Sequence, residues 1–368
     1  MSPDTPTVTS RDPLLQPFSI KHLTLRNRII STSHAIGYQH DGMPKERYQR
    51  YHEEKARGGI GLTMFGGSAT VSTDSPSVFG QLEMYSDEVI DWFGQFSERV
   101  HAHGAAIMCQ ISHLGRRTVW NSGDWLPTLS ASYTREPAHR CYAREMDHYD
   151  IERVIDDYAK AAWRCQQGGL DGVEILIHGH LPEQFWRADI NHRSDKYGGD
   201  LRNRMTFTFE LLDAVRAKVG NDFIVGLRMN TDEEATDGLQ ADDYRQIAQW
   251  HADTGMIDFF NLNSGRLDTM FGLAKYMPTM AMPLAPYLEQ VGEFRRDLNL
   301  PVMHACRIND VATARHAIKE QLVDLIAMTR GHIADPHIVN KIASGDEARI
   351  RPCVGAGHCS TYRRTSSR

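Results

Sequence analysis

The sequence predicts an α/β protein built as a (β/α)8 barrel, also called a TIM barrel. Short apolar segments suited to buried parallel strands alternate with segments whose apolar residues recur three and four positions apart. Eight such units follow one another, and eight parallel strands close this type of barrel. A doubly wound sheet is the alternative. It is disfavoured because no glycine-rich dinucleotide-binding turn follows a predicted strand. The glycines at 58, 59 and 61 lie before or at the start of the nearest predicted strand, not after it.

The predicted strands are short and mostly apolar, and they comprise residues 28–32, 61–65, 105–111, 173–177, 223–229, 259–263, 301–305 and 325–328. Helices are predicted between them, for example over residues 44–57 and along the apolar stripe from Val89 to Val100. Glycines at 104, 168 and 220 follow helical segments, as expected at helix C-caps. Before the first strand, residues 18–20 and 23–25 are predicted to form a hairpin that plugs one end of the barrel.

The chain is predicted to have three parts. Residues 1–12 are expected to be a disordered tail, residues 13–350 the barrel, and residues 351–368 a C-terminal tail. After the third strand, residues 116–147 form a long insert that the pattern leaves irregular and that carries Trp120 and Trp125. Loops of that length in a compact domain are usually functional or act as lids.

Composition excludes several classes of function. A net charge of −6 gives no electrostatic reason to expect binding to nucleic acid or to an anionic membrane. No apolar run is long enough to span a bilayer, and the polar start is not that of a signal peptide. Six scattered cysteines are too few for a disulfide scaffold in 368 residues. A cytoplasmic protein is therefore expected, and a homo-oligomer is left open.

Polar and charged residues cluster where the predicted strands end. Because the carboxyl ends of barrel strands converge on one mouth, we expect the active site there. The cluster comprises Ser33, His34, Gln110, His113, His178, His180, Arg228, Asn263, Cys306, Arg307, Thr329 and Arg330. Arg307 and Arg330 follow strands seven and eight, where such barrels commonly bind phosphate. Arg228 lies near the barrel axis and needs an anionic partner, which an electron-rich cofactor ring would supply.

Several motifs resemble those of the Old Yellow Enzyme family of FMN-dependent barrels, in the branch that contains trimethylamine dehydrogenase and 2,4-dienoyl-CoA reductase. They are LxNRI at 25–29, QxxHxGR at 110–116, DGVEI at 171–175, the segment 184–204 with its DKYGG and NR elements, VGLR at 225–228 and TRGHIADP at 329–336. They cover nearly the whole chain. Within this branch, residues 41–67 most resemble the demethylases of dimethylglycine, N-methylproline and related betaines.

The resemblance implies that FMN lies across the mouth of the barrel. The residues it implies in cofactor binding are Ser33, His34, Ala35, Gln110, Arg228, Cys306, Arg307, Thr329 and Arg330. Residues 33–35 would contact the dimethylbenzene side and the N5 edge through their backbone, and Gln110 would bind the pyrimidine edge. Arg228 would lie by N1 and O2, while Arg307 and Arg330 would hold the phosphate. Such a protein positions the ring and tunes it, and the cofactor carries out the redox chemistry.

Two departures from the family pattern refine this expectation. Trimethylamine dehydrogenase attaches its flavin to a cysteine directly after a histidine; the corresponding residue is Ala35, so non-covalent FMN is expected. Ene-reductases of the family grip a carbonyl oxygen with a pair of residues and protonate with a nearby tyrosine. The second member of the pair corresponds to His178 and the tyrosine to His180. The first member of the pair is replaced by apolar residues. A lone imidazole cannot form the two-donor clamp that polarises an enone.

Oxidation of a tertiary N-methyl amine is therefore the leading prediction, by hydride transfer to flavin N5. The amine must be neutral, and His178, expected to titrate near neutral pH, is the predicted proton acceptor, with His180 as a second catalytic candidate. His113 and Asn263 are predicted to line the substrate pocket. Trp120 and Trp125 could offer cation–π contacts to a methylated ammonium or simply pack as a lid.

The C-terminal tail holds Cys353 and Cys359, where relatives carry a longer cysteine motif for a [4Fe–4S] cluster. Such clusters require four thiolates, so an intact cluster is not expected and the pair is only an incomplete metal motif. Electrons are expected to leave through a separate acceptor: an electron-transfer flavoprotein, a reductase subunit or NAD. The alternatives are an NAD(P)H-dependent ene-reductase and an idle, truncated flavin-binding subunit.

Overall fold

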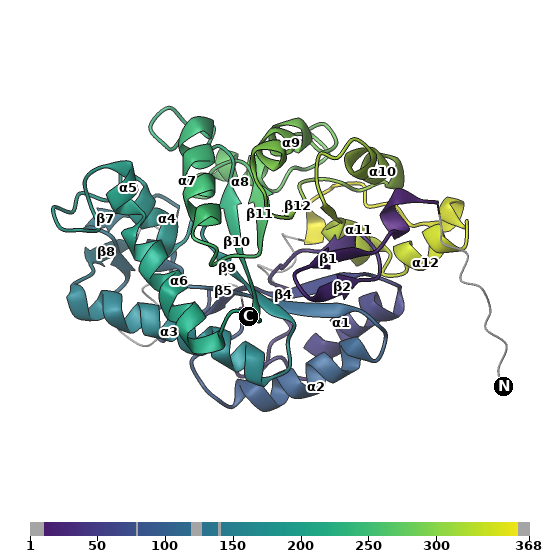
Figure 1. Cartoon of the computed structure of the whole chain (residues 1–368), viewed down its shortest axis with the longest axis horizontal. Coiled ribbons are helices and arrows are strands. Elements are labelled where there is room, and N and C mark those ends of the chain that lie inside the picture. The colour runs from purple at the N-terminus through teal and green to yellow at the C-terminus, as the bar shows by residue number, and fades with distance from the viewer. Residues whose placement is uncertain (1–10, 79, 119–126, 139–140, 360–368) are drawn as a thin grey trace.

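The structure is a computed structural model that describes residues 11–78, 80–118, 127–138 and 141–359. Eight parallel strands close a barrel, and each pairs with the next along the chain until the last pairs with the first (Figure 1). In order around the barrel they are β3 (Ile29–Ser31), β4 (Leu62–Thr70), β5 (Ala106–Ser112), β9 (Gly172–Leu176), β10 (Ile224–Asn230), β11 (Phe259–Asn263), β12 (Val302–His304) and β13 (Leu325–Ala327). Every predicted strand overlaps one of them, which confirms the predicted (β/α)8 barrel.

Amphipathic helices cover the outside of the barrel (Figure 1). The longer ones are α1 (Glu46–Arg57), α2 (Val89–His101), α3 (His148–Gln167), α6 (Thr206–Val219), α7 (Ala241–Asp253), α9 (Leu288–Asp297) and α10 (Val311–Lys319). Shorter turns are η1 (Pro13–Leu15), η2 (Gly115–Arg117), α4 (Leu181–Trp186), α5 (Leu201–Arg204), α8 (Met270–Tyr276), α11 (Thr329–Ala334), α12 (Ile338–Ala343) and η3 (Glu347–Arg349). The stripe from Val89 to Val100 is buried, as its spacing predicts.

The N-terminal hairpin is confirmed as a plug. Strands β1 (Phe18–Ile20) and β2 (Leu23–Leu25) pair antiparallel. Ile20 and Leu25 are buried in a cluster with residues from the first half of the barrel strands, such as Leu62 and Ile224. The plug thus fills the amino-terminal end of the barrel and leaves the carboxyl-terminal mouth for chemistry.

The insert after β5 is more regular than the sequence suggests. Its described part forms a small sheet of three strands, β6 (Leu129–Ser130), β7 (Thr134–Arg135) and β8 (Tyr142–Glu145). Each strand has only two to four residues, too few for an alternating pattern to identify in the sequence. Trp120 and Trp125 lie outside the described residues.

The described ends of both predicted tails are bound to the barrel. Asp12 caps η1, and its Oδ2 lies 2.8 Å from Arg315 Nε. At the other end, Asn309 donates to the backbone oxygen of Cys353 at 3.2 Å, and Met280 N donates to that of Gly355 at 2.8 Å.

Three buried histidines share one hydrogen-bond pattern. Nδ1 of His251, His304 and His332 donates to a backbone carbonyl at 2.8, 2.8 and 3.0 Å respectively. Among the described residues, Nε2 of each has no partner. Burial lowers the pKa of each of the three imidazoles to about 4. All three are therefore neutral in the folded protein at pH 7.

These histidines predict acid sensitivity. Because their pKa is lower in the folded than in the unfolded chain, unfolding takes up protons between about pH 6.5 and about pH 4, and stability falls as pH falls through that window. The contribution of one such group is on the order of 3 kcal/mol. His251→Phe keeps a ring against Trp186 and should flatten the pH dependence of the urea midpoint. His148→Gln, at an exposed position, is the control; equal flattening by both would refute this reading.

Candidate functional site

A buried glutamate organises the interior just below the mouth. Glu174 on β9 is fully buried, and its Oε1 accepts from Gln110 Nε2 at 2.6 Å. Its Oε2 accepts from Asn261 Nδ2 at 2.7 Å. Burial raises the pKa of Glu174, while the charge of Arg228 and the two amides oppose that shift. The side-chain oxygen of Gln110 accepts from Ser68 N at 2.9 Å. Because its nitrogen and its oxygen are both bound, the amide of Gln110 has one fixed orientation.

Arg228 lies beside this cluster and retains an unsatisfied donor. Its Nη2 donates to the hydroxyl of Tyr276 at 3.1 Å. With the Asn263 amide oriented so that its oxygen faces the guanidinium, that oxygen accepts from Nε at 3.1 Å and from Nη2 at 2.7 Å. Nη1 is buried and has no partner among the described residues. A buried donor of this kind costs free energy unless a ligand supplies an acceptor.

His178 lies two residues beyond the end of β9 and is fully buried. Its ring meets that of Tyr276 edge-on, with centroids 4.7 Å apart. Neither ring nitrogen has a hydrogen-bond partner among the described residues, although the backbone of Gly265 lies near. Burial and the charge of Arg228 lower the pKa of His178 well below its usual value. The expectation that His178 titrates near neutral pH is therefore wrong for this environment, and its imidazole is neutral.

His180 supports the loop that carries His178. Its Nδ1 donates to the backbone oxygen of His178 at 2.6 Å, and the residue begins α4 as its N-cap. Burial, with the charge of Arg117, lowers the pKa of His180 to about 3. Glu183 holds the same loop, since its Oε2 accepts from Gly179 N at 2.5 Å.

The loop after β3 uses its side chains within the protein. Ser33 Oγ donates to the backbone oxygen of Phe65 at 2.7 Å and accepts from Gly67 N at 2.6 Å. His34 Nε2 lies 2.8 Å from the hydroxyl of Tyr51. Gly67 has a φ of +57°, and a Cβ on it would lie 2.0 Å from Ala35 N, so only glycine permits this approach. What residues 33–35 can present to a ligand is therefore mainly their backbone.

Strands β12 and β13 end in the predicted phosphate corner. Cys306 and Arg307 both have positive φ, +66° and +60°, a strained conformation typical of functional loops. Arg307 Nε is buried without a partner among the described residues, and Arg330 Nη1 donates to the backbone oxygen of Pro278 at 2.7 Å. Thr329 fastens this corner to β3, because its hydroxyl accepts from Thr32 N at 2.9 Å.

His113 lies behind the mouth, although the sequence suggests a pocket residue. It is fully buried; Nε2 lies 2.9 Å from Asp74 Oδ1, and Nδ1 accepts from Gly115 N at 3.0 Å. Asp74 also pairs with Arg153. Both ring nitrogens of His113 are thus engaged, and the residue can support the wall of the site but offers a ligand no free nitrogen.

Three arginines near the His178 loop are neutralised by carboxylates. They are Arg116, Arg187 and Arg266, paired with Asp189, Glu233 and Asp268. Asp268 Oδ2 is shared, at 3.6 Å from Arg116, 3.5 Å from Arg187 and 2.8 Å from Arg266. Apart from Asp189, these groups line a small hollow beside the loop together with Arg117, Gly179 and Leu267.

Sequence reasoning missed Glu174, Asn261 and Tyr276. For Glu174 a signal existed, since a carboxylate within an otherwise apolar strand needs a buried partner. Asn261 lies in a buried strand with no such charge, and Tyr276 lies 13 residues beyond the end of β11, which ends at Asn263. Nothing in the local sequence of Tyr276 shows that it returns to the mouth.

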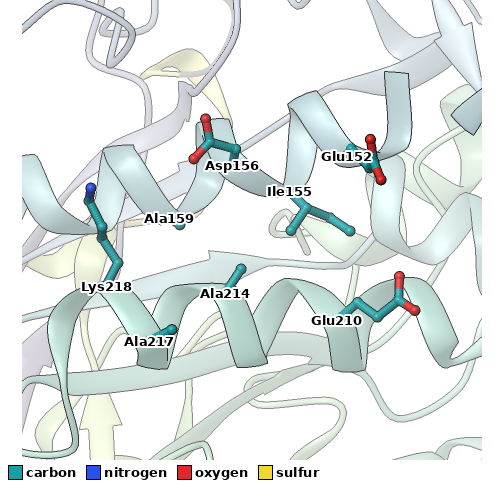
Figure 2. Close-up of a pocket in the computed structure, with 8 residues that line it drawn as sticks. All are labelled: Glu152, Ile155, Asp156, Ala159, Glu210, Ala214, Ala217 and Lys218. Atoms are coloured by element: carbon teal, nitrogen blue, oxygen red, sulfur yellow. The ribbon is translucent and has the colours of Figure 1, made fainter. Parts of the chain in front are cut away.

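A second, shallow groove lies on the outer face between α3 and α6 (Figure 2). Its lining residues are Glu152, Ile155, Asp156 and Ala159 of α3 and Glu210, Ala214, Ala217 and Lys218 of α6. None of the predicted site residues lies there, and the alanines reflect close helix packing. The candidate site is therefore the mouth.

The described residues contain no group of three or more His, Cys, Asp or Glu side chains placed to hold a metal ion. Cys353 is partly buried and Cys359 is exposed. Within the same described ranges, none of the helices could cross a membrane.

Comparison with known proteins agrees with this geometry. Residues 13–348 match the model of the NADH:flavin oxidoreductase / NADH oxidase family. A "Probable N-methylproline demethylase" of Rhizobium meliloti (strain 1021) is 49% identical over 95% of this chain and 51% of its own length. A "Multifunctional alkene reductase/demethylase OYE" of Caballeronia cordobensis is 48% identical over 98% of this chain and 53% of its own. An "N,N-dimethylglycine/sarcosine dehydrogenase" of Chromohalobacter salexigens is 45% identical over 95% of this chain and 51% of its own.

The chain thus spans about half the length of the curated relatives it matches. The family match covers nearly the whole barrel, including every strand and the mouth described above. The chain therefore belongs to the NADH:flavin oxidoreductase / NADH oxidase family.

Proposed function

We propose that this chain is an FMN-dependent oxidoreductase that removes an N-methyl group from a methylated amino acid such as N-methylproline or dimethylglycine. One observation carries the proposal: at the mouth, the unsatisfied guanidinium of Arg228 lies near a buried histidine with no partner among the described residues. The names of the similar proteins support the reaction class.

The residues present fit a non-covalently bound FMN. Its phosphate would be held by Arg307 and Arg330, neither of which pairs with a carboxylate in the described structure. Gln110, fixed by Glu174, would bind the pyrimidine edge. Arg228 would donate its unsatisfied Nη1 to the N1 and O2 side, where negative charge develops. The backbone of residues 33–35 would line the N5 edge; Cys306 and Thr329 would shape the phosphate corner.

When bound, FMN supplies the hydride acceptor at N5. A hydride leaves an N-methyl C–H with its two electrons, and the substrate becomes an iminium. Water then adds to the iminium. The resulting carbinolamine breaks down to formaldehyde and the secondary amine. The neutral His178 imidazole would accept a hydrogen bond from the ammonium that enters and hold its nitrogen in line until the proton passes to water, and His180 would keep the loop in place.

The electrostatics of the mouth favour an amine over an ammonium. Burial is the largest cause of the lowered pKa of His178, followed by the charge of Arg228, and both disfavour any cation bound beside it. A substrate that arrives protonated therefore loses its proton more readily in the site than in water. The electrostatic environment thus favours the neutral amine, whose free lone pair hydride loss requires. From the sequence alone, this deprotonation is assigned to His178 acting as a base.

Ene reduction is the second candidate, because one similar protein carries both alkene reductase and demethylase in its name. Against it stands the isolated His178, since polarising an enone requires two donors on its oxygen. An idle flavin-binding subunit would account for the unsatisfied donor of Arg228 but not for the unpartnered ring of His178. For reoxidation we propose a separate acceptor, an electron-transfer flavoprotein, a reductase subunit or NAD, in a cytoplasmic setting.

An anaerobic screen tests the proposed function. The purified holoprotein should release FMN on heat denaturation, and N-methylproline or dimethylglycine should bleach the flavin absorbance without NADPH. Formaldehyde should appear in proportion to the flavin reduced. Bleaching by NADPH alone, with reoxidation by an enone, would select ene reduction instead. A protein that takes up FMN but is bleached by neither would contradict both reactions and leave the idle subunit.

A further inference from the structure

Four guanidinium groups near the mouth have no carboxylate within ion-pair distance in the described parts of the chain. They are Arg117, Arg228, Arg307 and Arg330. The proposed function assigns three of them to the flavin, one to its pyrimidine side and two to its phosphate. Arg117 is left over, and a positive group held in a partly buried site without an anion calls for one.

Arg117 forms no ion pair within the described parts of the chain. Its Nε is buried and has no hydrogen-bond partner in the described ranges. The charges of Glu136, Asp268 and Glu183 act on its guanidinium, but none of the three forms an ion pair with it in the described ranges. Asp268 already faces three other guanidinium groups through Oδ2. Glu183 is bound by the Tyr244 hydroxyl at 2.7 Å and by the backbone of the His178 loop.

Arg117 lies close to the loop that carries His178. It belongs to η2, directly after β5, and it lines the same hollow as Gly179 and Leu267. Its charge contributes to lowering the pKa of both His178 and His180, and the ring of His178 packs against that of Tyr276. Arg116, its neighbour in sequence, points into the ion network instead.

We propose that Arg117 binds the carboxylate of the methylated amino acid, and that it selects amino acids over simple methylated amines. The assignment rests on the proposed demethylation. In an amino acid only two bonds separate the amine nitrogen from the carboxyl carbon, so the group that holds the carboxylate must lie close to the group that holds the nitrogen. Arg117 beside His178 meets that requirement, and a guanidinium can hold a carboxylate with two parallel hydrogen bonds.

A binding experiment tests this without requiring turnover. N,N-dimethylproline has a quaternary nitrogen with no lone pair, so it can bind but cannot be oxidised, and N,N-dimethylpyrrolidinium is the same cation without the carboxylate. Both are titrated into the holoprotein and followed by the perturbation of the flavin spectrum. Arg117→Gln should weaken binding of dimethylproline roughly 10- to 100-fold and leave binding of dimethylpyrrolidinium unchanged. Arg117→Lys should fall between, because it keeps the charge but not the paired donors.

Arg135→Gln is the matched control, since Arg135 is an exposed residue of the neighbouring insert. The proposal is overturned if Arg117→Gln weakens both ligands equally, if it changes neither, or if the wild type binds dimethylproline no better than dimethylpyrrolidinium. Failure of demethylation looks different: the wild type then discriminates the two ligands normally, but N-methylproline does not bleach its flavin.

Discussion

Replacing His178 with alanine is expected to slow substrate-driven flavin reduction by roughly 100-fold or more while FMN stays bound. The side chain is fully buried between Tyr276 and the end of β9, and neither ring nitrogen has a partner among the described residues. Its absence removes the group that holds the amine nitrogen, but it removes no contact assigned to the phosphate or the pyrimidine. Stopped-flow absorbance under anaerobic conditions gives the rate constant, and FMN fluorescence gives cofactor affinity.

The pH profile separates positioning from simple base catalysis. Because the pKa of His178 lies well below its usual value, the wild-type rate constant for flavin reduction should show no inflection from this imidazole near neutral pH. His251→Phe, which alters a buried histidine on α7, is the control and should leave the rate unchanged. An unaltered rate in His178→Ala would remove this residue from the mechanism.

Replacing Glu174 with leucine is expected to lower the free energy of unfolding by about 3–5 kcal/mol and to weaken FMN binding. The substitution leaves the amides of Gln110 and Asn261 without their acceptor and removes a negative charge that acts on the Arg228 guanidinium. Once released, the Gln110 amide no longer presents a fixed edge. Urea denaturation of the FMN-free chain measures stability, and fluorescence titration measures the FMN dissociation constant.

Glu174→Gln is the matched variant because it keeps the shape. Both carboxylate oxygens accept from amide nitrogens, so a glutamine can satisfy only one of them and sets a donor against the other. Glu174→Gln should lower the free energy of unfolding measurably, but by less than Glu174→Leu does. Equal stability of the wild type and Glu174→Leu would show that this buried carboxylate does not organise the interior.

Much of the fold could be predicted because periodic burial is a local property. The eight strands, the N-terminal hairpin and the longer helices follow from the spacing of apolar side chains, and the predicted strand 259–263 agrees with β11 at both ends. The three short strands of the insert escaped, since two-residue strands such as β6 have no period. Their pairing depends on neighbours that lie elsewhere in the chain.

The chemistry of the site divides in the same way. The sequence alone determined the barrel, the residues at the strand ends and the family, because strand order in a closed barrel brings those ends together whatever the loops do. Only the tertiary structure decided what those residues experience. It showed that His178 is a weak base and that both nitrogens of His113 are engaged. It also showed that Arg117, unlike Arg116, forms no ion pair with Asp268. Burial and electrostatic surroundings are sums over groups distant in sequence, so no local pattern records them.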